Sequence, residues 1–214
     1  MEAFLEINSN KTELIKYLTE RWCSEAPKLL RAHQCLVIGG GKSSKTVMLT
    51  KMGENVIPEL AADLEEADPR LLLHMKHALE VDKRKYGLFI ASDTDIAVIA
   101  IGALCHMRDC QLYQCINHRL VPLHLIHSTI GPVQSSALVA FHALTGCDTN
   151  GYLSCRKSKK GLWEQACQDA DVIQGMSTFG TGLQPPTSIP DCSYFLSYLK
   201  RMPVRKEPAS HQQG

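Results

Sequence analysis

The chain has 214 residues, enough for one good-sized hydrophobic core or for one core with a small appendage. Apolar residues make up 44% and charged residues 21%, as in globular proteins, and the net charge of +1 gives no global basic excess. A nucleic-acid-binding role therefore needs a local basic patch. The longest apolar run, residues 96–105, is far too short to span a bilayer, and Glu2 and Glu6 stand where a secretory signal carries basic residues.

Nine cysteines are many for this length. Without a visible secretory signal, we interpret them as reduced thiols of a nuclear or cytoplasmic protein, mostly small core residues, with no disulfide-linked partner. Cys105, Cys110 and Cys115 could be combined with His106 and His118 into a zinc site. Their spacing matches none of the paired two-residue patterns of structural zinc modules, which favours the core interpretation.

The first predicted element is a helix over residues 11–22, which Asn10 can cap. Its apolar residues recur at helical spacing: Leu14, Ile15, Leu18 and Trp22. Residues 35–38 are a short apolar run before three glycines, a pattern that predicts a buried strand and a turn. The segment GGGKSSKT resembles a phosphate-binding loop, but Leu36 stands where that loop needs its first glycine, so a plain turn is the better interpretation.

The next stretch, residues 48–64, is mixed and predicts a loop or a short strand that leads into a helix. Pro69 is tolerated only in the first turn, so this helix begins between Glu65 and Pro69 and runs to about Val81. We expect a buried stripe on this helix of Leu71, Leu72, Met75, Ala78 and Leu79. We also expect a polar stripe of Arg70, His74 and His77.

The second half of the chain alternates strands with helices. The predicted strands are residues 86–91, 111–116 and 121–126. The predicted helices are residues 92–104, 135–144 (closed by Gly146), 161–170 and 191–200. Residues 177–190 predict a loop, and the polar tail from Pro203 predicts disorder. Because the strands are continuous apolar runs between helices, the pattern predicts an α/β fold with a mostly parallel sheet flanked by helices.

Three short acidic motifs stand at the ends of predicted elements: EEAD at 65–68, SDTD at 92–95 and GCDT at 146–149. The carboxyl ends of parallel strands form the crevice in which α/β folds bind ligands, and Asp93 and Asp95 fall there by position. Two carboxylates about 4 Å apart repel by about 4 kcal/mol at a dielectric of about 20, unless a divalent cation neutralises them. Oxygen ligands suit Mg²⁺ or Mn²⁺, and a pair of such ions can activate water for phosphodiester hydrolysis.

Each motif also has a purely structural interpretation, which stays open. Ser92 and Asp95 have the spacing of a capping box, which stabilises a helix by about 1 kcal/mol. Asp68 before Pro69 is a natural N-cap, and Asp148 can start a turn. Local physics does not show that the three motifs converge.

In order and type, the motifs resemble those of the flap-endonuclease (XPG-type) branch of the PIN-like nucleases. A closer resemblance is to transposon-associated animal proteins with EEADTR, SPDTDV and HAFTGCDT segments. EEADPRLLLHMKHAL, IASDTDIAV and FHALTGCDT carry it, over roughly residues 14–170. The resemblance implies a Rossmann-like nuclease domain over residues 1–175, and residues 176–214 then form a loop, a short helix and a tail. The implied catalytic and metal-binding residues, around a two-ion Mg²⁺ or Mn²⁺ site, are Glu66, Asp68, Asp93, Asp95 and Asp148.

The chain also departs from this family at its beginning. Flap-endonuclease folds start with a strand that carries a metal-binding aspartate, and a second aspartate precedes their helical arch; neither has a counterpart here. The resemblance therefore implies an N-terminally truncated domain. It is either a structure-selective nuclease or a catalytically inactive module that binds nucleic acid or protein.

A basic cluster follows the third motif: Arg156, Lys157, Lys159 and Lys160. In the resembled nucleases this region grips duplex DNA, so the expected partner is DNA, including branched or flap structures, and no membrane. Arg70 and Lys76 would contact phosphates if their helix lines the crevice. A solvated basic loop explains the cluster equally well.

Overall fold

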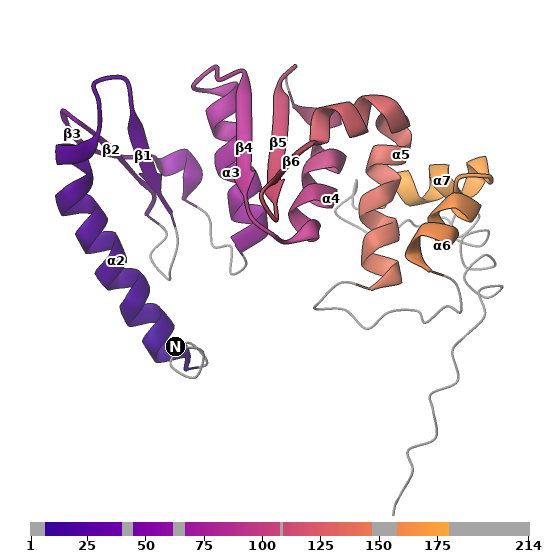
Figure 1. Ribbon diagram of the computed structural model, residues 1–214, viewed down its shortest axis with the longest axis horizontal. Helices are drawn as coiled ribbons and strands as arrows, with labels where there is room; N and C mark the ends of the chain where they lie inside the picture. Colours follow the sequence, from indigo (N-terminus) through magenta and orange to yellow (C-terminus); the bar gives the residue numbers. More distant parts are fainter. Residues whose placement is uncertain (1–6, 40–44, 62–66, 108, 147–157, 180–214) are drawn as a thin grey trace, which may run out of the picture. The chain divides into compact units, whose positions relative to one another are not determined.

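The computed structural model describes residues 7–39, 45–61, 67–107, 109–146 and 158–179 (Figure 1). The chain divides into two units, Met1–Asp82 and Lys83–Gly214, and each contains one three-stranded sheet. Helices and strands occur in both, which confirms the predicted α/β composition. The predicted mostly parallel sheet is wrong, because the first sheet is antiparallel and the second is mixed.

The first unit opens with helix α2 (Asn8–Leu29), which extends beyond the predicted helix at both ends. Its N-cap is Ile7, without a side-chain hydrogen bond, so the predicted cap by Asn10 is wrong. Ala26 near the C-terminal end is buried, whereas Trp22 remains 49% exposed. In Figure 1 the N-terminal turns of α2 extend past the sheet of this unit. The apolar spacing therefore predicted a helix correctly, but most of that stripe has no cover in the described residues.

Sheet A is an antiparallel meander of β1 (Cys35–Ile38), β2 (Val47–Thr50) and β3 (Gly53–Val56). β1 has its predicted bounds but is only partly buried. The β2–β3 hairpin was not predicted. Thr50 stabilises its turn, because Oγ1 donates to the Gly53 carbonyl and accepts from the Met52 N–H. β3 is exposed along its whole length, so this sheet contributes little core beyond β2.

The short helix η1 (Pro58–Leu60) follows sheet A, and α3 (Ala67–Glu80) comes next. α3 begins within the range 65–69 that was predicted from Pro69. The expected buried stripe of α3 is largely wrong, because only Leu79 is buried. The His74 ring is partly buried against Gly39. It lies so close that a Cβ added at Gly39 would be 2.7 Å from the ring. Desolvation by burial, together with Arg70 and His77, lowers the pKa of His74.

The second unit contains sheet B, formed by β4 (Tyr86–Ile90), β5 (Gln111–Ile116) and β6 (Arg119–Pro122). β4 and β5 are parallel and β5 and β6 antiparallel. Helix α4 (Thr94–Ala103) and the turn η2 (Leu104–His106) make the crossover between the parallel strands. The predicted strand over 121–126 is wrong, because β6 ends at Pro122 and a helix begins at the next residue.

That helix, α5 (Leu123–Thr145), is two helices in succession, because Gly131 interrupts it with φ 82°. Gly146 ends it at φ 98°, as the sequence predicted. α4 packs closely on α5: a Cβ added at Gly102 would lie 2.3 Å from Cγ2 of Val139. Figure 1 shows α4 and α5 on the same side of sheet B.

Two short helices complete the described fold, α6 (Lys159–Ala166) and α7 (Ala170–Ser177). They replace the single helix predicted over 161–170. Asp169 caps α7 by accepting from two backbone N–H groups, which explains the break. Their apolar faces pack with α5 in one core of Ala137, Ala140, Phe141, Leu162, Ala166, Val172, Ile173 and Met176. The predicted helix over 191–200 and the tail lie outside the described residues.

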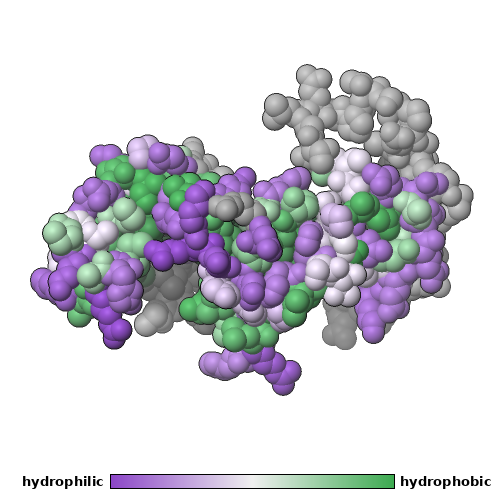
Figure 2. Space-filling view, turned by 90° about the horizontal axis from the view of Figure 1, so that it is seen from above, coloured by the Kyte–Doolittle hydropathy of each residue, from purple (hydrophilic) through white to green (hydrophobic). Residues whose placement is uncertain are grey.

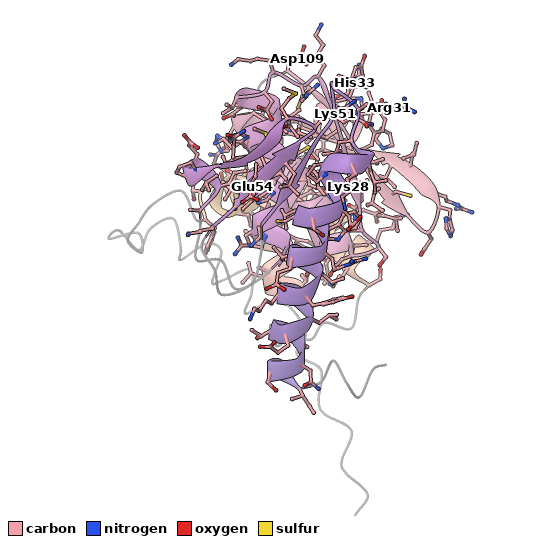
Figure 3. All side chains as sticks on the ribbon, turned by 90° about the vertical axis from the view of Figure 1, so that its left-hand side faces the viewer. Lys28, Arg31, His33, Lys51, Glu54 and Asp109 are labelled. Atoms are coloured by element: carbon pink, nitrogen blue, oxygen red, sulfur yellow. The ribbon has the colours of Figure 1, made fainter. Side chains whose placement is uncertain are left out.

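The surface of the described residues mixes hydrophobic patches with hydrophilic side chains (Figure 2). Figure 3 labels several exposed basic side chains of the first unit: Lys28 in the last turn of α2, Arg31 and His33 in the link to β1, and Lys51 in the β2–β3 turn. Lys28 forms an ion pair with Glu25 at 3.2 Å, and a cation is favourable at a helix C-terminus. Within the described ranges, no helix is long and apolar enough to cross a membrane.

Candidate functional site

The SDTD motif runs from the link after β4 into the first turn of α4, at the carboxyl end of the parallel strand pair. Asp93 is the N-cap of α4, and its Oδ1 accepts a hydrogen bond from the Asp95 N–H at 2.9 Å. Ser92 is therefore not the cap, which corrects the predicted capping box. The backbone N–H groups of the first helical turn carry partial positive charge and stabilise both carboxylates.

Gln114 holds this link from the neighbouring strand β5. Its side chain is fully buried, and Nε2 donates to the carbonyls of Ala91 at 2.9 Å and Asp93 at 2.6 Å. The opposite orientation of the side-chain amide would place its oxygen against two carbonyl oxygens. The geometry therefore fixes which end of the amide is the nitrogen. Gln114 therefore sets the path of the backbone that presents both carboxylates. The sequence offered one overlooked signal, a polar residue inside an apolar strand.

His142 joins the motif from α5. Its Nε2 lies 2.8 Å from Oδ1 of Asp95, and both side chains are partly buried. A carboxylate only accepts hydrogen bonds, so Nε2 is the donor. Sequence reasoning did not single out His142, although it belongs to the same HALTGCDT segment as Asp148. The contact joins the second motif to the helix that leads into the third.

The basic residues after the third motif have structural partners where they are described. Lys159 donates from Nζ to the carbonyl of Gly146, at the C-terminal end of α5. A cation is favourable at that end of a helix. Lys160 lies 3.8 Å from Glu164 in an exposed pair one turn along α6. Their predicted role in binding nucleic acid stays a prediction, and Arg156 and Lys157 lie outside the described residues.

The remaining predicted residues are distributed over other parts of the chain. Asp68 lies in the first turn of α3 in the first unit, on the same helix as Arg70 and Lys76. Glu66 and Asp148 lie outside the described residues. The structure thus brings Asp93 and Asp95 together at one strand end, and convergence of all five carboxylates stays a prediction.

The described carboxylates fit a magnesium-type ion in their chemistry. Asp93 and Asp95 each use Oδ1 for the bond described above, and each carboxylate has a second oxygen of the kind that binds such an ion. Mg²⁺ is commonly held by one or two carboxylates and several waters. Among the described residues, no group of three or more histidine, cysteine, aspartate or glutamate side chains is placed to hold a metal. That Glu66, Asp68 and Asp148 supply further ligands stays a prediction from the motifs.

Comparison of the chain with protein-family models, with curated proteins and with solved structures finds no match.

Proposed function

We propose that this chain is a metal-dependent, structure-selective nuclease domain that hydrolyses DNA phosphodiesters at the carboxyl end of β4. The hydrogen bond between His142 and Asp95 is the observation that carries the proposal. It connects the SDTD motif to the HALTGCDT helix inside one unit, as a shared acidic site requires. The order of the three motifs and their resemblance to flap-endonuclease-type proteins support the same function.

In such a site, some residues of the chain would bind the metal ion and others would orient those ligands. Asp93 and Asp95 would hold Mg²⁺ or Mn²⁺ through Oδ2, with Glu66, Asp68 and Asp148 as the expected further ligands. The bound ion would supply an activated water and neutralise the developing charge on the phosphate. His142 orients Asp95, and Gln114 fixes the backbone carbonyls of Ala91 and Asp93. Partners of this kind typically change metal affinity by about 10- to 100-fold when they are removed.

Cleavage of a labelled 5′-flap DNA with Mg²⁺ or Mn²⁺ tests the proposal. The double variant Asp93→Asn plus Asp95→Asn keeps both side-chain volumes, and asparagine is as good an N-cap as aspartate. We expect it to lose cleavage, while Asp109→Asn, a control at an exposed aspartate before β5, keeps it. Cleavage retained by the double variant would refute the assigned site.

One observation favours a second function, a catalytically inactive module that binds nucleic acid. The N-terminus of α4 and His142 stabilise both carboxylates without a cation. Such a module would bind DNA in a salt-dependent manner and would show no metal-dependent cleavage. Wild-type protein that binds flap DNA but leaves it intact at all Mn²⁺ concentrations would favour this function over the first.

A further inference from the structure

Sheet B has one covered and one open face. Along β4 the burial alternates, with Phe89 facing the core and Ile90 83% exposed. Leu112 and Gln114 of β5 are fully buried on the covered face. Successive residues of a strand point to opposite faces, so the alternate positions form a second surface. A sheet with a parallel pair normally has helices on both faces. In the described residues of this unit the helices lie on one side, and only the first turn of α5 reaches the other face, through His124.

The open face is aromatic and apolar. In the strand register, Leu88 lies beside Tyr113, and Ile90 lies beside Cys115. Tyr86 is 68% exposed at the start of β4. A hollow of about 220 Å³ is lined by Tyr86, Gly87, Leu88, Tyr113 and Leu120.

The ring of Tyr113 is held in place from both ends. Its hydroxyl donates to Oε1 of Gln111 at 3.0 Å, and His124 packs edge-on against the ring at 5.0 Å between centroids. A pre-oriented aromatic ring loses little freedom when a ligand stacks on it. The hollow therefore has one fixed ring and one exposed ring along its walls.

A run of cations leads directly onto this face. Lys83, Arg84 and Lys85 are exposed and immediately precede Tyr86, and residues 83–90 contain no acidic side chain. The opposite end of β4 leads to Asp93 and Asp95. Five strand residues span roughly 16 Å, so cations, aromatic face and acidic motif follow one another along a single strand. The cations and the adjoining aromatic face match an anionic partner with flat apolar groups.

We propose that the open face of sheet B binds single-stranded nucleic acid, with bases stacking on Tyr86 and against Tyr113. The phosphates of that strand contact Arg84 and Lys85. Every base offers a flat face to an aromatic ring, so this binding tolerates different sequences. The inference rests on the proposed function in one respect: it identifies the bound nucleic-acid strand as part of the nuclease substrate. The binding itself needs neither metal nor cleavage.

Fluorescence anisotropy of a labelled single-stranded oligothymidylate in EDTA tests the inference without any cleavage. We expect Tyr86→Ala to weaken binding about tenfold, because it removes one stacking platform. Tyr86→Phe keeps the ring and should bind within about twofold of the wild type. Tyr17→Ala, at an exposed tyrosine of α2 in the first unit, is the matched control and should change nothing. A far-ultraviolet circular dichroism melt of each variant confirms folding.

The basic run is tested by Arg84→Ala plus Lys85→Ala. Each phosphate contact of a single strand contributes about −0.7 to the slope of log affinity against log salt, so this variant should reduce the slope by about 1.4. Equal affinity of Tyr86→Ala and wild type, or no binding by the wild type at about 50 mM salt, overturns the inference. Flap cleavage without this binding contradicts the open-face inference alone. Binding without cleavage contradicts the nuclease proposal alone.

Discussion

The two sheets have the same number of strands but different connections, and the difference explains where the candidate site lies. Sheet A is a meander whose strands pair with their neighbours in sequence. Sheet B joins its parallel strands through α4, so the chain turns sharply at the carboxyl end of β4. That turn carries Asp93 and Asp95. A parallel pair thus requires a strand-to-helix turn at the end of the first strand, which a meander does not contain.

Among the described residues, the second unit also has the larger hydrophobic core. β3 of sheet A is exposed along its length, whereas the α5–α6–α7 cluster of the second unit buries Phe141 edge-on against Trp163. Phe141→Ala should therefore destabilise the second unit by about 3–5 kcal/mol. Val56→Ala, at a 53% exposed position of β3, should change stability by about 0.5 kcal/mol or less. Urea unfolding of both variants measures the contrast, and equal losses would contradict it.

The contact between α4 and α5 gives the next largest effect. Gly102→Ala places a methyl group where Val139 already packs, so we expect a loss of about 2–3 kcal/mol from overpacking. Val139→Ala in the same chain should restore part of that loss. A double-mutant cycle from thermal unfolding measures the coupling. Strictly additive losses would show that the two side chains do not compete for this space.

Gln114 tests whether the link at the end of β4 depends on the neighbouring strand. Gln114→Leu removes two hydrogen bonds to Ala91 and Asp93, so the free energy of unfolding should fall by about 2 kcal/mol. Gln174→Leu, at an exposed position of α7 in the same unit, is the control and should have little effect. If the link depends on Gln114, metal-dependent cleavage should fall as well. If Gln114→Leu unfolds and cleaves like the wild type, Gln114 does not hold the link at the end of β4.

The smallest effect concerns pH in the first unit. Burial lowers the pKa of His74, so the unfolded chain binds a proton more readily than the folded one. Stability contributed by neutral His74 is complete above the unfolded value, about 6.5, and is lost as pH falls toward the lower folded value. Thermal unfolding at pH 7.5 and 5.5 should show this loss, and His74→Gln should reduce it. An unchanged pH dependence in that variant would contradict the assignment.

Several elements followed from the sequence because their signals are local. β4 is an apolar run, β5 is mostly apolar, and Gly146 provides the positive φ that ends α5. The β2–β3 hairpin was missed because Lys51 and Met52 lack the usual Asn-Gly or Asp-Gly turn signal. The strand predicted over 121–126 failed because a short apolar run is compatible with either a strand or the first turn of a buried helix.

The candidate site shows the same limit. The position of Asp93 and Asp95 at a strand end could be predicted, because it needs only the bounds of one strand and one helix. The partner His142 could not, because it approaches from a helix 47 residues along the chain. The role of Gln114 depends on the parallel register of β4 and β5, which no local pattern encodes. Whether Glu66, Asp68 and Asp148 join them stays a prediction.

Binding of Mn²⁺ tests the central claim most directly. A ligand that binds the native state raises its stability, by about 2.7 kcal/mol at a free concentration one hundred times the dissociation constant. We predict that Mn²⁺ raises the melting temperature of the wild type and of Asp109→Asn, and leaves Asp93→Asn plus Asp95→Asn unchanged. An equal shift in all three proteins, or none in the wild type, would contradict a metal site at the end of β4.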